Sequence, residues 1–145
     1  MLMRKFWPLL MAGSVGAMSV QAATADTFDL LVGSYTAGTS EGIYRLQFDS
    51  RTGQFSGPPV LAAKAQNPSW LTLSPDQKRL FVVNENGPGQ QDEVGRVSSY
   101  RIDPANHQLT LINQVQSLGN EPTHSSLAAD GRYLFVANYS VLQDP

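Results

Sequence analysis

A segment that occurs twice constrains the fold of this chain more than any other feature. Residues 67–85 return as residues 121–139, and seven of the nineteen aligned positions are identical. The identities include a Pro, an Asp, a Leu-Phe-Val run and a final Asn. Short strands of this kind cannot bury their apolar side chains alone, so each copy must stack against its neighbours. The period therefore predicts an all-β chain built as a β-propeller.

The repeat covers a whole four-stranded blade. The same offset carries residues 43–49 onto residues 97–103, where the first, fourth and sixth positions are apolar in both copies. Without the leader described below, residues 26–145 hold about 2.2 such units, whereas propellers close with roughly 4–8 blades. We therefore expect a partial β-propeller of about two and a quarter blades, with bounds near 26–66, 67–120 and 121–145. We interpret the chain as a fragment of a longer propeller.

The start of the chain, residues 1–25, has the pattern of a secretory signal peptide. Arg4 and Lys5 precede an apolar stretch over residues 6–20, and small residues follow it up to Ala25. This order of charged, apolar and small residues is typical of a cleaved export signal. A membrane anchor is the alternative, but the stretch is shorter than the roughly 20 apolar residues that a membrane-spanning helix needs. We expect export, cleavage and a periplasmic or secreted protein without further membrane contact.

Charge and cysteine content exclude several classes of function. Cleavage removes two cations, so 8 Lys and Arg face 12 Asp and Glu, a net charge of −4. This balance leaves no basic patch for a nucleic-acid backbone. The chain has no Cys, which excludes disulfides, thiolate metal sites and a Cys nucleophile. We also find no His, Asp and Glu set with the spacing of metal ligands and no phosphate-binding glycine loop, and we expect neither a metal nor an organic cofactor.

Short apolar runs separated by turn residues predict the strands. We expect them at residues 28–35, 42–49, 59–65, 69–74, 79–85, 97–103, 109–117, 123–128 and 132–140. In antiparallel order, the tight turns then share one rim of the propeller and the longer links share the other. The starts of the innermost strands and the ends of the second strands meet at this loop-rich rim, around the central channel, where ligand sites are favoured.

Two residues at that rim are candidate catalytic groups. His124 opens the innermost strand of the third unit and can act as a general acid or base. It can equally be a structural histidine that bonds a neighbouring loop, and Trp70 occupies the equivalent place one unit earlier. Glu85 follows the second strand of its unit and can act as a base or accept a hydrogen bond from a substrate hydroxyl.

Four further residues are candidates for substrate binding. Asn84 and Asn138 end successive second strands, Tyr139 follows the latter, and Ser34 holds the matching place in the first unit. Their side chains can present hydrogen-bond donors and acceptors to the channel. The alternative for such an Asn is a structural one, in which it bonds its own loop. His107 lies in a turn on the opposite rim and is not a candidate.

Several motifs together resemble those of a known family. They are Pro122-x-His124-Ser125 followed by residues 130–140, the segments 31–36 and 42–44, and residues 100–104 with 108–113. In this combination the chain is similar to the seven-bladed-propeller lactonases, the group of 6-phosphogluconolactonases related to the fungal carboxy-muconate cyclase. The resemblance runs from about residue 29 to residue 140, and it implies that a complete propeller would have seven blades.

The resemblance implies a hydrolase that opens a sugar δ-lactone to its aldonic acid, with no metal or organic cofactor and as a monomer when complete. Of the family's polar residues around the channel mouth, His124 and the group of Glu85, Asn84 and Asn138 fall within this chain. The leader favours an unphosphorylated lactone, because a phosphorylated sugar lactone is a cytosolic metabolite. A non-catalytic propeller of the cell envelope and a lactonising cycloisomerase are the alternatives. We expect the present chain alone to be inactive.

Overall fold

The computed structural model describes residues 27–140, and the predicted signal peptide lies outside this range. The described residues form nine strands and no helix, and hence no helix that could cross a membrane. The strands are β1 (Thr27–Gly33), β2 (Gly42–Asp49), β3 (Gln54–Lys64), β4 (Pro68–Leu73), β5 (Arg79–Asn84), β6 (Arg96–Ile102), β7 (Leu109–Gln116), β8 (Asn120–Leu127) and β9 (Leu134–Ser140). The all-β prediction is confirmed.

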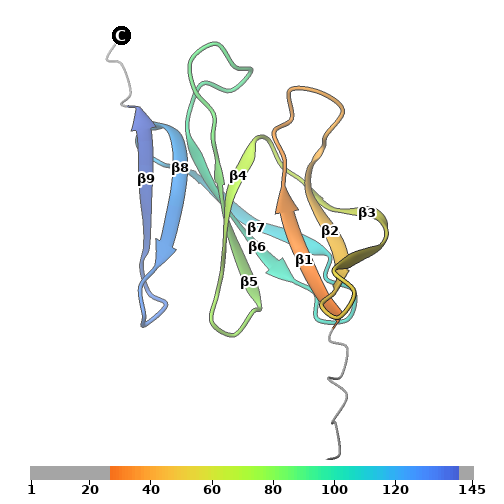
Figure 1. Ribbon diagram of the computed structural model, residues 1–145. Helices are drawn as coiled ribbons and strands as arrows, with labels where there is room; N and C mark the ends of the chain where they lie inside the picture. The colour runs from red at the N-terminus through yellow and green to blue at the C-terminus, as the bar shows by residue number, and fades with distance from the viewer. Residues whose placement is uncertain (1–26, 141–145) are drawn as a thin grey trace, which may run out of the picture.

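The strands form three antiparallel sheets that follow one another in the chain. Their orders are β1-β2-β3, β4-β5-β6-β7 and β8-β9, so within each sheet the strands pair in the order of the sequence. Figure 1 shows the three sheets side by side, with the tight turns at the bottom and the long links at the top. The arrangement is that of a partial propeller, as predicted. Two strands start at least three residues earlier than expected, since β3 begins at Gln54 and β8 at Asn120.

Each tight turn is built around one aspartate. Asp49, Asp76, Asp103 and Asp130 each accept a hydrogen bond from the backbone N–H two residues later, at 2.8 to 3.1 Å. Each carboxylate accepts a hydrogen bond from an N–H that has no partner on a neighbouring strand, and this bond stabilises the turn. The four aspartates are evenly spaced along the chain, at half the period of the repeat. The turns are therefore specified locally, hairpin by hairpin.

The apolar core lies between the first and second sheets. Ile43 and Ala62 from the first sheet meet Leu80, Val82 and Tyr100 from the second, and all five are buried. Strand β5 is covered on both faces there, which its continuous apolar run predicts. Burial of this kind stabilises the fold by roughly 25 cal/mol per Å² of apolar surface removed from water.

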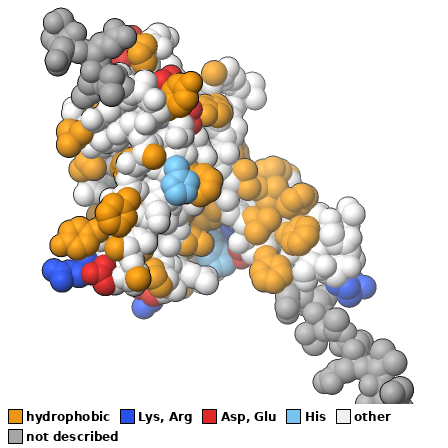
Figure 2. All heavy atoms as spheres, turned by 60° about the vertical axis from the view of Figure 1, so that its left-hand side comes forward, with side chains coloured by type: hydrophobic (Ala, Val, Ile, Leu, Met, Phe, Trp, Pro, Cys, Tyr) orange, Lys and Arg blue, Asp and Glu red, His pale blue; other side chains and the backbone are white. Residues whose placement is uncertain are grey.

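Strand β9 carries a similar apolar run but is covered on one face only. Phe135 is 64% exposed and Tyr139 is 81% exposed, because no further sheet of the described residues packs against them. Figure 2 brings this side of the molecule forward, and apolar side chains stand on its surface. One face of the third sheet is therefore left uncovered within residues 27–140.

Contacts at both rims join the first sheet to the second. At the tight-turn rim, the Nδ1 atom of His107 lies 2.7 Å from a carboxylate oxygen of Asp29 on β1. At the opposite rim, Asn67 accepts hydrogen bonds from the backbone N–H and the hydroxyl of Thr36, at 3.1 and 3.0 Å. Its own amide donates to Gln90 at 2.6 Å and to Asn86 at 3.3 Å. Asn67 thus connects the long links of two sheets.

The close approach of β1 to β4 yields a stability prediction. A Cβ on Gly33 would lie 2.0 Å from the backbone carbonyl oxygen of Pro68, which cannot move without shifting β4. We expect Gly33→Ala to lower the free energy of unfolding by about 1–3 kcal/mol, the usual cost of overpacking. Gly38→Ala is the matched control, because nothing lies within 4 Å of its Cβ position. Urea unfolding measures both, and equal stabilities would contradict the packing argument.

Candidate functional site

Three side chains from three consecutive sheets meet at the loop-rich rim. Tyr35 follows β1, Glu85 follows β5 and Glu121 lies on β8. The hydroxyl of Tyr35 donates a hydrogen bond to the carboxylate of Glu85, and Glu121 acts on the same hydroxyl through its charge. We call these three residues the rim cluster. Since Tyr35 is half exposed, the cluster is open to solvent and to a ligand.

The two carboxylates control the ionisation of the tyrosine. The hydrogen bond to Glu85, partial burial and the negative charges of Glu85 and Glu121 together raise the pKa of Tyr35 to about 12. Each of these effects disfavours the ionised form of the Tyr35 hydroxyl. Tyr35 therefore remains a neutral hydrogen-bond donor throughout the physiological range, and the Glu85 carboxylate it bonds is the acceptor.

The backbone and side chain of Glu121 are held in an unusual arrangement. Its φ angle is 51°, in the left-handed region that residues other than Gly, Asn and Asp seldom adopt. Its backbone N–H donates to the carbonyl oxygen of Asn86 at 2.8 Å, and one carboxylate oxygen accepts a bond from the Ser140 hydroxyl at 2.9 Å. The side chain also lies against Gly87, where a Cβ would come within 2.4 Å of the Glu121 Cγ atom.

The internal repeat provides a control for Glu121 within the same molecule. Asn67 lies one repeat earlier, has a φ angle of 41°, and also precedes a buried proline. Its partner Asn86 is in turn equivalent to Ser140, the partner of Glu121. The two residues therefore occupy equivalent positions in the contact between blades, and Asn adopts the left-handed backbone there with less strain than Glu. Since the neutral Asn67 makes the equivalent contact, the negative charge of Glu121 is not needed for it, and this makes Glu121 a functional candidate.

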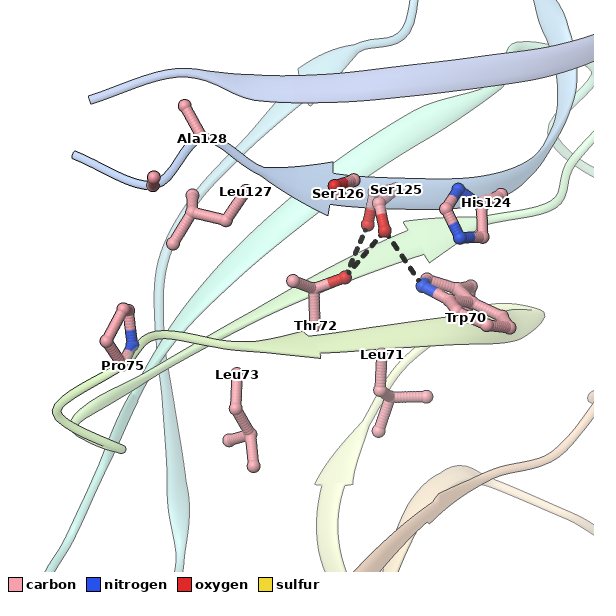
Figure 3. Close-up of a pocket in the computed structure, with 11 residues that line it drawn as sticks. Trp70, Leu71, Thr72, Leu73, Pro75, His124, Ser125, Ser126, Leu127 and Ala128 are labelled. Carbon is pink, nitrogen blue, oxygen red and sulfur yellow. Dashed lines mark hydrogen bonds between the residues drawn. The ribbon is translucent and has the colours of Figure 1, made fainter. Parts of the chain in front are cut away.

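A second group of side chains lies on the inner strands. The rings of Trp70 on β4 and His124 on β8 have centroids 4.4 Å apart and are tilted by 46°. They border a groove of about 500 Å³ between the two strands, which Figure 3 shows together with the hydrogen bonds from Trp70 and Thr72 to Ser125. His124 lies in the middle of β8 and not at its start as predicted, because the strand begins earlier, at Asn120.

Asn84 occupies a buried, structural position, whereas Asn138 makes a related contact from an exposed position. Asn84 is 0% exposed, its amide donates to the Gln66 carbonyl at 2.6 Å, and its oxygen accepts from the Ser98 hydroxyl at 2.6 Å. The amide of Asn138 donates in the same way to the carbonyl of Ser117, at 3.2 Å. Both amides fasten the end of a second strand to the link that precedes their own blade. Asn84 has no exposed surface that a substrate could touch.

The remaining predicted residues are close to the rim but make few contacts. Ser34 is partly buried and donates a long hydrogen bond of 3.5 Å to the carbonyl of Tyr35, and Tyr139 is exposed on the outer face of the third sheet. Within residues 27–140, no hydrogen bond or ring contact joins His124 to Glu85. The structure therefore gives two separate groups, the rim cluster and the pair on the inner strands.

Sequence reasoning missed Tyr35 and Glu121 as members of the site. A signal for Glu121 is present in the repeat, since the alignment places a charged residue opposite Asn67. Tyr35 follows Ser34 directly, and the match of Ser34 to Asn84 places Tyr35 opposite Glu85, which is the signal that could have pointed to it. The described residues contain no group of three or more His, Cys, Asp or Glu side chains that could hold a metal ion.

The cations of this rim are paired with nearby carboxylates. Arg96 makes an ion pair with Asp92, and Lys64 makes one with Glu41. The hydrogen bond from Arg96 is the main reason that the pKa of Asp92 is lowered. The rim cluster itself carries two carboxylates and no cation.

Comparison with known proteins identifies the family. The family described as "Lactonase, 7-bladed beta-propeller" matches residues 29–142. The chain belongs to this lactonase family. The resemblance inferred from the motifs is thereby confirmed, and the three sheets are sheets of a lactonase propeller.

Solved and curated relatives agree with this assignment. The periplasmic gluconolactonase PpgL of Pseudomonas aeruginosa is 55% identical, with a TM-score of 0.75, and the match covers 81% of this chain and 32% of that one. A putative 6-phosphogluconolactonase of Bacteroides uniformis is 34% identical, with a TM-score of 0.68 and coverages of 80% and 32%. The 6-phosphogluconolactonase of Bacillus subtilis strain 168 is 35% identical over 108 residues, which cover 74% of this chain and 29% of that protein. The chain thus spans about a third of its relatives' length.

The repeat comparison predicts opposite effects for two reciprocal substitutions. We expect Glu121→Asn to leave the free energy of unfolding unchanged or to raise it by up to about 1 kcal/mol, because Asn adopts the left-handed backbone at lower cost. Asn67→Glu should lower it by about 1–3 kcal/mol, because Glu cannot donate to Gln90 and Asn86. Chemical unfolding measures both variants. A clear loss of stability in Glu121→Asn would show that the carboxylate is structural.

The tyrosine–carboxylate contact predicts an alkaline titration. Tyr35 should ionise near pH 12, and Glu85→Gln should move its pKa back toward the ordinary value of 10.0. Unfolded Tyr35 loses its proton first, so its contribution to stability is complete below pH 10 and disappears as the pH rises to 12. Tyrosinate absorbance measures the shift, with Tyr35→Phe to identify the signal. An unchanged titration in Glu85→Gln would exclude the contact.

Proposed function

We propose that this chain forms part of the active-site rim of an enzyme that hydrolyses a sugar δ-lactone to its aldonic acid. The observation that carries the proposal is the placement of Glu121 in the rim cluster of a lactonase propeller. Its left-handed backbone and its bonds to Asn86 and Ser140 hold its charge near the hydroxyl of Tyr35. A site assembled from several blades on a rigid scaffold is the usual form of a ligand site at a propeller mouth.

The groups present support a simple hydrolytic mechanism. Glu85 takes a proton from a water molecule, whose oxygen adds to the ring carbonyl carbon. The bond from that carbon to the ring oxygen then breaks, the ring oxygen takes up a proton as it becomes a hydroxyl, and the acid ionises to the aldonate. Tyr35 holds the Glu85 carboxylate through its hydrogen bond. His124, which belongs to the separate group on the inner strands, is our candidate for the acid that protonates the leaving oxygen, and this role requires the lactone to extend from the rim cluster to the middle of β8.

The charge of the rim favours an unphosphorylated lactone. Arg96 and Lys64 are already paired, and Glu85 and Glu121 would repel a phosphate. A neutral, hydroxyl-rich ring meets no such repulsion. The 55% identical P. aeruginosa protein is named a periplasmic gluconolactonase, which fits the same substrate class. We propose an aldonolactone as substrate and, from the leader, an exported, periplasmic or secreted enzyme that is monomeric when complete.

The same charges weigh against the two alternatives. A lactonising cycloisomerase would bind a dicarboxylate and would need free cations at the mouth, but Arg96 and Lys64 are engaged. A non-catalytic propeller would have no use for a carboxylate in the strained backbone of Glu121. We further propose that the present chain alone lacks activity, since it spans about a third of its relatives' length.

A chimera tests the proposed activity. Residues 27–140 would replace the matching sector of the P. aeruginosa gluconolactonase, and hydrolysis of glucono-δ-lactone would be followed by proton release. We expect turnover above the spontaneous rate. Glu85→Gln and His124→Ala should each lower kcat by about a hundredfold, the usual contribution of a general acid or base.

His107→Ala is the matched control for His124, because His107 lies on the opposite rim. An unchanged kcat in His124→Ala would remove that residue from the mechanism, and the same result in Glu85→Gln would remove the proposed base. A well-folded chimera that only binds the lactone, without turnover, would favour the non-catalytic alternative.

A further inference from the structure

Trp70 combines a large apolar surface with an exposed position on an inner strand. Its side chain is 42% exposed, although indole is the largest apolar group among the described residues. It borders the groove between β4 and β8 together with His124 and Ser126 (Figure 3). Exposure of this much aromatic surface to water is unfavourable, and at a concave site a bound ligand commonly covers such a surface.

The indole is held in one orientation. Its Nε1 atom donates to the backbone carbonyl of Ser125 at 3.0 Å, and Thr72 donates to the same oxygen at 3.0 Å. The hydroxyls of Thr72 and Ser125 are also 2.9 Å apart. The ring is therefore fixed before any ligand arrives, so binding against it costs little additional side-chain entropy.

The surroundings of the indole suit one sugar ring. The groove has a volume of about 500 Å³, within the range of roughly 300–1,000 Å³ found for small-molecule sites. The exposed imidazole of His124 stands 4.4 Å from the indole, centroid to centroid, and can reach polar groups of a ring placed there. The groove continues along β4 and β8 past Leu73 to Pro75 and Ala129 at the tight turns, so the indole and the imidazole border only one end of this volume.

We propose that Trp70 is the platform on which the lactone ring lies, with its C–H face packed against the indole and its polar edge toward His124. This inference rests on the proposed function, which it deepens by assigning a specificity residue. A six-membered lactone whose hydroxyls are all equatorial presents only C–H bonds to such a platform. A lactone with an axial hydroxyl carries that polar group on one of its two faces, and stacking through this face would cost the hydroxyl its hydrogen bonds to water. Such a lactone can therefore stack through its other face only, so Trp70 favours glucono-δ-lactone over galactono-δ-lactone.

The internal repeat supports a location at the channel. Trp70 and His124 are equivalent positions, one repeat apart, on successive innermost strands. An aromatic ring thus stands at the same height on both inner strands of the described residues. A ring that served only to join β4 to β8 would be expected to be buried between them, and Trp70 is not.

Binding and catalysis can be tested separately. Trp70 is the only Trp beyond Trp7, so in the full chain carrying Trp7→Phe it alone reports by fluorescence. The probe is gluconolactam, a non-hydrolysable analogue of the lactone, and galactonolactam is its stereochemical control. We expect gluconolactam to change the emission of Trp70 and galactonolactam to bind more weakly.

Kinetics in the chimera give the second readout. Trp70→Ala should raise KM for glucono-δ-lactone about tenfold, the value of one aromatic contact, with a smaller effect on kcat. It should also reduce the preference for the gluco over the galacto lactone. Thr72→Val is the matched control, since it removes the other side-chain donor to the Ser125 carbonyl and leaves the indole in place.

The outcomes distinguish this inference from the proposed function. Binding of the lactam at Trp70 without any turnover in the chimera would support the platform and contradict the lactonase proposal. Turnover with an unchanged KM and stereochemical preference in Trp70→Ala would overturn the platform and leave the lactonase proposal intact. Equal effects of Trp70→Ala and Thr72→Val on KM would overturn it as well, because they would indicate a purely structural contact. Emission that does not respond to gluconolactam would also count against it.

Discussion

The rest of the structure depends on one contact between successive blades. In each case this contact is made by the residue that precedes a buried proline, which is Asn67 in the second blade and Glu121 in the third. Asn67 bonds the long link of the first sheet through Thr36 and that of the second through Gln90. Glu121 bonds the second link through the Asn86 carbonyl and its own blade through Ser140. Sheets that touched only through apolar side chains could slide over one another. These polar contacts fix their positions at the rim where the chemistry is proposed.

The same contact explains how a structural repeat can carry a functional difference. Both residues adopt a left-handed backbone, which a repeated fold imposes at equivalent positions. At the first position the residue is neutral and all its bonds are satisfied within the protein. At the second, a carboxylate takes its place and adds its charge to that of Glu85 beside the Tyr35 hydroxyl. Divergence at one position of the repeat therefore adds a charge at a contact between blades, within the proposed active-site rim.

The strands and the family could be predicted from the sequence because their signals are contiguous, whereas the site depends on tertiary contacts. Apolar runs mark β2 and β5, an Asp marks every tight turn, and the family comparison confirms the lactonase motifs. Glu85 was identified from its place after a strand, and its partner Tyr35 holds the matching place in the first unit, but the hydrogen bond between them depends on a contact between two sheets. Asn84 lies at the end of a strand, where a ligand-binding residue is expected, but it is fully buried. The sequence alone does not distinguish a buried Asn from an exposed one at such a position. The pairing of Trp70 with His124 depends on the distance between two strands of different sheets.

The two rims of the molecule differ in how their structure is determined. Since each turn is closed by its own side chain, the rim that carries Asp76 and Asp130 is specified by short stretches of chain, whereas the opposite rim depends on residues from several blades. Arg132 takes part in one of these turns through its backbone N–H and is exposed, so its side chain marks a place on the first rim where a label can be attached. A probe attached there would report on the protein from the end opposite the proposed active-site rim.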